Sequence, residues 1–96
     1  MRALDYCTIF EIVDAGFMPR VHRLSNSAIY IHARNEHPPP HYHQMGPDWE
    51  VAVYIRTRQI REGWAPPADL LEGLEWAAKN TALLLKKWVE YNERDR

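Results

Sequence analysis

The fold is decided by the stretch Trp49-Glu50-Val51-Ala52-Val53-Tyr54-Ile55, in which large apolar residues recur at every second position. Successive side chains of an extended chain point to opposite faces, so these apolar residues share one face. The other face carries Glu50, Ala52 and Tyr54, and Arg56 continues it. This alternation predicts a strand with one buried face.

Shorter runs on both sides of this stretch predict further strands, separated by residues that favour turns. Two such turns are Ser25-Asn26-Ser27 and Met45-Gly46-Pro47-Asp48. The predicted strands cover residues 20–24, 28–33, 40–44, 49–55 and 57–61. We expect them to form a small antiparallel β-meander of about four to five strands.

After Trp64 the apolar residues change to the three- and four-residue spacing of a helix. The predicted apolar stripe consists of Leu70, Leu71, Leu74, Ala77, Ala78, Thr81, Leu84, Leu85 and Trp88. Pro66 and Pro67 suit a helix start, because a missing N–H costs nothing there. Asn80-Thr81 could break the helix, so one kinked helix and two short helices are both open. The fold class is therefore α+β, with Trp76 and Trp88 as core anchors.

Length and composition bound the class of protein. The 96 residues suffice for one domain, which we place at 18–96, with 1–17 as an N-terminal extension that could add a strand. The single Cys7 cannot form an internal disulfide, and no apolar run is long enough to span a membrane. We therefore expect a cytoplasmic protein with no membrane contact. The net charge of −1 argues against nucleic-acid binding as its main role.

The most unusual local feature is the segment Asn35-Glu36-His37-Pro38-Pro39-Pro40-His41-Tyr42-His43. Three prolines stiffen the chain before the predicted strand begins. On that strand His41 and His43 project to one side and Tyr42 to the other. The simplest interpretation is structural: the histidines form local hydrogen bonds and Tyr42 packs in the core.

A metal site is one alternative for this segment. His41 and His43 could bind Zn²⁺ if His37 or Glu36 supplied a third ligand. On an extended proline path, however, His37 and His41 lie roughly 12 Å apart, too far to share an ion. A bound ion would need His22, His32 or a second chain. We therefore expect no tightly bound metal in the monomer, and no cofactor.

Catalysis is a second alternative. His41 and His43 could act as acid and base in a small metal-independent ribonuclease, with Arg56 and Arg58 holding phosphate. Alternating charge on an outward strand face is also an ordinary protection against aggregation, which is the simpler interpretation of both arginines.

Several of these features together resemble the bacterial family called domain of unknown function 4160, over about residues 18–92. The resemblance is carried by Met18-Pro19, Ile29-Tyr30-Ile31, the segment from Glu36 to His43, Leu74-Glu75-Trp76 and Leu84-Leu85-Lys86-Lys87-Trp88. It implies a small cytoplasmic α+β protein, often encoded beside another small protein in a toxin–antitoxin-like arrangement. It implies no established activity, and 1–17 lies outside the pattern.

The sequence holds no complete catalytic constellation, so we favour a non-enzymatic role. The leading hypothesis is a protein-interaction or regulatory module that works with a protein partner or as a homodimer, because a small core benefits from a partner. The candidate binding residues are Tyr30, His37, Tyr42, Arg56 and Arg58.

Overall fold

The computed structural model describes residues 18–33 and 37–92, and within them five strands precede two helices. The elements are β2 Arg20–Arg23, β3 Ala28–Tyr30, β4 His41–Met45, β5 Glu50–Tyr54, β6 Ile60–Gly63, α1 Pro67–Lys79 and α2 Thr81–Asn92. The α+β class predicted from the sequence is confirmed. The predicted N-terminal extension, residues 1–17, lies outside the described residues.

The strands form one antiparallel sheet in the order β2-β3-β4-β5-β6, so the predicted meander is confirmed. Both predicted turns are present. The Leu24 N–H donates to the Ser27 carbonyl at 2.8 Å, and the Gly46 N–H donates to the Trp49 carbonyl at 3.0 Å. Because every connection joins neighbouring strands, β4 lies at the centre of the sheet and β6 at one edge.

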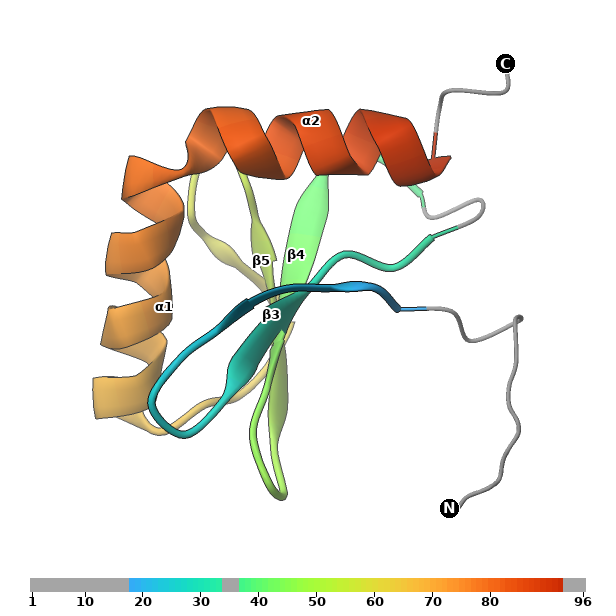
Figure 1. Cartoon of the computed structure of the whole chain (residues 1–96). Coiled ribbons are helices and arrows are strands. Elements are labelled where there is room, and N and C mark those ends of the chain that lie inside the picture. The colour runs from blue at the N-terminus through green and yellow to red at the C-terminus, as the bar shows by residue number, and fades with distance from the viewer. Residues whose placement is uncertain (1–17, 34–36, 93–96) are drawn as a thin grey trace, which may run out of the picture.

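The two helices follow the sheet and meet at a corner, with the strands inside that corner (Figure 1). They supply Ala77, Leu84 and Trp88 to the hydrophobic core. The strands contribute Ile29, Tyr42, Val51 and Val53, and the segments next to them contribute Ile31, Ile55 and Ala65. Burial of these side chains is the main force that holds helices and sheet together.

The strand that decided the fold is buried more completely than its alternation predicts. Val51, Val53 and Ile55 have no exposed surface, as expected. Ala52, on the opposite face, is also buried, with 2% of its surface exposed. His43 lies on β4 directly opposite Ala52. The methyl group of Ala52 is small, so the larger His43 side chain beside it leaves little of the alanine exposed. The expectation of a single buried face was therefore incomplete.

The last strand begins later than predicted. Residues 55–57 form a turn, residues 58–59 belong to no strand, and β6 covers Ile60–Gly63. Arg58 adopts a left-handed backbone conformation with φ of 61°, which reverses the chain. The Arg58 N–H donates to the Tyr54 carbonyl at 2.8 Å, and the Tyr54 N–H donates to the Gln59 carbonyl at 2.9 Å. Sequence alternation cannot reveal this, because arginine rarely adopts a positive φ.

Two helices, separated at Asn80, resolve the alternative that the sequence left open. The Asn80 side-chain amide donates to the Trp76 carbonyl at 2.9 Å, and its backbone N–H donates to the Ala77 carbonyl at 3.1 Å. These bonds satisfy carbonyls that the end of α1 would leave unpaired. The predicted stripe is wrong at Leu71, which is 55% exposed, and at Ala78, which is also exposed.

Helix α1 contacts the sheet through a buried glycine. A Cβ atom on Gly73 would overlap the side-chain amide of Gln44, which is fully buried on β4. That amide donates to the Asp69 carbonyl at 2.8 Å and to Ser27 Oγ at 3.0 Å. Gln44 thus ties α1 and the β2–β3 turn to the central strand. Neither described helix has the length and apolar character that crossing a membrane requires.

Candidate functional site

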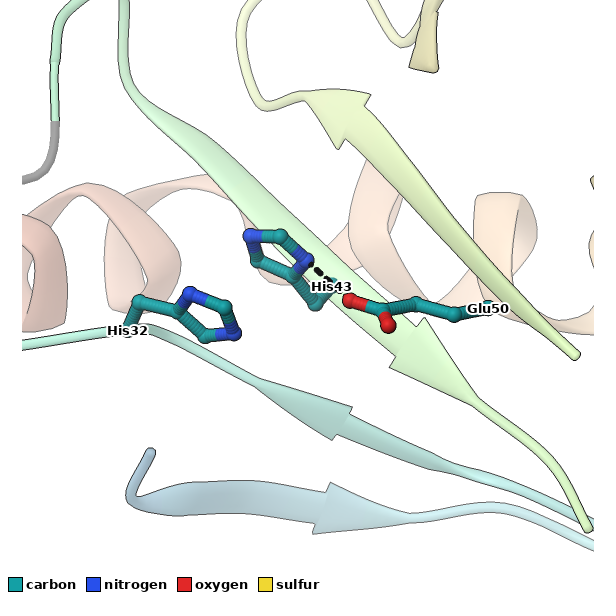
Figure 2. A group of neighbouring side chains, drawn as sticks. All are labelled: His32, His43 and Glu50. Atoms are coloured by element: carbon teal, nitrogen blue, oxygen red, sulfur yellow. Dashed lines mark hydrogen bonds and ion pairs between the residues drawn. The ribbon is translucent and has the colours of Figure 1, made fainter. Parts of the chain in front are cut away.

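Three polar side chains converge on one face of the sheet near its centre (Figure 2). His43 lies on β4, Glu50 begins β5, and His32 follows the end of β3. Each offers one ligand-type atom, and these three atoms lie within 4.8 Å of one another. Among the described residues this is the group of histidine and acidic side chains close enough to share a metal ion. We call these three residues the His–Glu cluster.

His43 is the centre of this cluster and is held from two sides. Its Nδ1–H donates to Glu50 Oε2 at 2.7 Å, which fixes the ring orientation. The His32 ring stacks on it with centroids 3.6 Å apart and planes within 3° of parallel. His43 is 6% exposed, whereas the Glu50 side chain is 45% exposed, so the cluster opens to solvent on the Glu50 side.

The surroundings of His43 favour its neutral form. Burial lowers the pKa of His43, because a charged imidazolium loses hydration there. The neighbouring His32 ring lowers this pKa further, and the hydrogen bond to Glu50 acts in the opposite direction. A neutral imidazole retains a lone pair, which is the form that binds a metal or accepts a proton.

His41 has a different environment from His43. It is 1% exposed, and its Nδ1–H donates to the Pro39 carbonyl at 2.9 Å. Its ring packs against Trp88 of α2 with centroids 5.0 Å apart, and edge-on to His43 with centroids 5.3 Å apart. The structure therefore brings the two predicted histidines together but buries both, which favours a packing role for His41.

The two predicted binding tyrosines lie on different faces of the sheet from one another. Tyr42 is fully buried in the core, and burial raises the pKa of its phenol against the opposing effect of Arg58. Its hydroxyl is buried, and within the described part of the chain it has no hydrogen-bond partner. Tyr30 is half-buried and pairs with His43 across the β3–β4 register. Tyr30 thus lies beside the His–Glu cluster, and Tyr42 does not.

The remaining predicted residues lie at the surface. His37 is exposed and does not belong to the His–Glu cluster, and Glu36 lies outside the described residues. Arg56 and Arg58 are exposed in the turn between β5 and β6 rather than on strands. Placing them on one strand face was therefore wrong, because the left-handed Arg58 begins the return of the chain.

Glu50 is the member of the cluster that sequence reasoning missed. The signal that could have found it is the turn predicted at 45–48, because a hairpin there would bring Glu50 near His43. In the structure they are diagonal neighbours, because His43 pairs with Ala52 and Met45 pairs with Glu50. From the sequence, His32 is one of three possible sources of a further metal ligand, with His22 and a second chain. Its stacking on His43 depends on the path after β3 and has no signal in the sequence.

The fold and the cluster define a small α+β protein with a five-stranded antiparallel meander, two C-terminal helices and a buried histidine on its central strand. A family model, described as Domain of unknown function (DUF4160), matches residues 27–89. The chain therefore belongs to this family, as the sequence resemblance predicted. No curated protein and no solved structure matches this chain.

Proposed function

We propose that this chain is a cytoplasmic protein-interaction module that binds an extended, acidic segment of a partner protein along β6. The observation that supports it is a run of nine consecutive exposed residues, 56–64, which covers the β5–β6 turn, all of β6 and Trp64. In the described sheet β6 pairs only with β5, so its outer edge has no strand beside it. An unpaired edge can accept a strand from another protein.

Apolar side chains flank this edge. Ile60 is 48% exposed at the start of β6, and Trp64 is 63% exposed just after its end. An exposed tryptophan beside free backbone groups is the kind of residue that contributes most to protein–protein binding. The Trp64 N–H donates to the Glu50 carbonyl at 3.0 Å, which fixes the backbone from which the indole projects.

The charge of the same run indicates the partner's chemistry. Residues 56–64 carry Arg56, Arg58 and Arg61 against one acid, Glu62, so the net charge is three minus one, or +2. Arg61 and Glu62 form a surface ion pair at 3.2 Å, which leaves two arginines of the turn to face a partner. Charge complementarity then favours an acidic segment.

A defined partner comes from the family resemblance, which implies a toxin–antitoxin-like gene pair. We propose that the product of the neighbouring gene supplies the acidic segment, and that the complex regulates one of the two proteins. A role as a regulatory partner requires no catalytic group on this chain. It is therefore compatible with the burial of His41 and His43.

The experiment is a titration of the full-length chain with the purified product of the neighbouring gene, followed by calorimetry. Trp64→Ala should weaken binding by at least about tenfold, as expected for an exposed tryptophan that a partner covers. The matched control is Leu71→Ala, because Leu71 is similarly exposed at 55% but lies on α1. The control should bind like the wild type.

Two outcomes would contradict the proposal. One is the absence of binding to the neighbouring product, and the other is an equal loss in the Trp64 and Leu71 variants. Binding to RNA instead, with an affinity that falls steeply as salt rises, would assign the arginines to phosphate and reject the protein partner.

A further inference from the structure

We propose that the His–Glu cluster, formed by His32, His43 and Glu50, is a binding site for one Zn²⁺ ion or a similar borderline divalent cation. This proposal goes beyond the interaction surface at β6 and does not depend on it. It rests on the convergence of three ligand-type atoms from three segments of the chain, each within 4.8 Å of the others (Figure 2).

The donor set has the chemistry of such a cation. Two imidazoles and one carboxylate are the ligands of many zinc sites that keep a fourth position for water. Magnesium and calcium prefer oxygen ligands and would find only Glu50 suitable. Tetrahedral bonds of about 2.0–2.1 Å place ligand atoms roughly 3.3 Å apart. The three atoms are therefore at most about 1.5 Å farther apart than the ligands of one tetrahedral ion.

Two present contacts must change when the ion binds. The proton shared by His43 and Glu50, whose atoms lie 2.7 Å apart, gives way to the metal. The stack of His32 on His43, whose ring centroids lie 3.6 Å apart, must open, because a ligated ion lies in the plane of each imidazole and the planes of two parallel stacked rings cannot both contain it. His32 follows the end of β3, where rotation of its side chain does not disturb a strand pair.

The loss of these two contacts sets the expected affinity for zinc. An ion must replace a hydrogen bond and a ring contact, so the dissociation constant should be micromolar rather than nanomolar. This agrees with the expectation, drawn from the sequence, that the monomer holds no tightly bound metal. His32 is one of the three ligand sources that the sequence left open, the others being His22 and a second chain. The Glu50 side chain is 45% exposed, so an ion can reach the cluster from solvent.

The test is a calorimetric titration of the full-length chain with zinc chloride, after chelator treatment and removal of any affinity histidines. The wild type should bind one ion per chain with micromolar affinity, and saturating zinc should raise its thermal midpoint, because the ion binds the folded state. Millimolar magnesium should do neither. His32→Ala and Glu50→Gln should each weaken zinc binding by at least about tenfold, the loss seen even for residues that only support a metal ligand.

The matched control is His22→Ala. His22 is also a half-buried histidine in a ring stack, but its partner is Trp76, with centroids 4.4 Å apart. This variant and Cys7→Ser should bind zinc like the wild type. The two cluster variants avoid the buried His43, so loss of folding does not confuse the result, and circular dichroism checks that they are folded.

The proposal is overturned if no heat of binding appears at high-micromolar zinc, or if His32→Ala and Glu50→Gln bind as the wild type does. It is also overturned if binding disappears with His22→Ala or Cys7→Ser, or if one ion is held between two chains. A negative result in this zinc titration would not count against the β6 interface. That interface is tested separately with Trp64→Ala, and Trp64 is not a member of the His–Glu cluster.

Discussion

The Nδ1 atom of His43 lies 2.7 Å from Glu50 Oε2, in a hydrogen bond that joins the central strand β4 to β5. One partner is buried and the other is half-exposed, with side chains 7% and 45% accessible. Glu50 thus remains partly hydrated while His43 does not. Burial is therefore the largest influence on the pKa of His43, and this pKa lies below the ordinary value of 6.5.

This lowered pKa predicts acid sensitivity of the metal-free protein. The unfolded chain takes up a proton at His43 near pH 6.5, and the folded chain does so only at lower pH. Protonation therefore favours unfolding, and the free energy of unfolding should fall as the pH drops from about 7.5 to about 5.5. Urea denaturation in the presence of a chelator measures it. A His43→Gln variant should show a shallower fall, and a wild-type stability that rises on acidification would contradict the prediction.

The Gly73–Gln44 contact predicts an unusual effect of a helix-favouring substitution. Gly73→Ala should improve helix propensity by about 1 kcal/mol in isolation. In this fold the new methyl overlaps the buried Gln44 amide, so we expect a net loss of about 1–3 kcal/mol.

Urea denaturation of a double-mutant cycle measures that coupling. In a Gln44→Ala background the overlap is gone, and Gly73→Ala should become neutral or stabilising. If Gly73→Ala is equally destabilising in both backgrounds, Gln44 is not what the methyl meets.

His37 and His41, on either side of the three prolines, should differ sharply in how much they contribute to the free energy of unfolding. His41→Ala removes a ring packed on Trp88 and a hydrogen bond to Pro39, and should lower the free energy of unfolding by roughly 2–3 kcal/mol. His37→Ala, its matched control, alters an exposed side chain and should stay within about 0.5 kcal/mol of the wild type.

The His41→Ala variant also tests the ribonuclease alternative. If His41 has a packing role, overexpression of the wild-type chain should not arrest growth. Growth arrest that His41→Ala relieves, in a variant with wild-type stability, would favour catalysis by His41 and His43 instead.

Much of the fold followed from local patterns, because β5 and the helix break at Asn80 are specified by residues close in sequence. The alternation at 49–55 places Val51 and Val53 in the core, and both are fully buried. Asn80-Thr81 indicated a possible break or cap with one or two helices left open, and in the structure the Asn80 side chain caps α1. Local patterns were sufficient where neighbours in sequence decide the conformation.

The incorrect or missing predictions concern residues whose positions depend on contacts between segments far apart in the sequence. Leu71 fits the helical stripe by spacing, but Gly73 is the residue that faces the sheet, because only a glycine leaves room for Gln44. His32 joins His43 through the path of the chain after β3, which no spacing rule gives. The cluster is therefore a product of tertiary structure, while its central member, His43, was a candidate from the sequence.

Removal of residues 1–17 should leave a folded domain. The described sheet and core are built from residues that begin after this segment, starting with β2 at Arg20. A chain of residues 18–96 should retain a cooperative thermal transition, followed by circular dichroism. Loss of that transition would show that the N-terminal segment contributes to the core.

The most direct test of the proposed function is hydrogen–deuterium exchange of the full-length chain, alone and with the product of the neighbouring gene. A strand added to β6 forms backbone hydrogen bonds along its outer edge. The amides of residues 60–64 should therefore exchange more slowly in the complex, while those of α1 around Leu71 should not change. Protection confined to α1 or α2, or no change at residues 60–64 in a complex that has formed, would contradict the proposal that β6 is the binding surface.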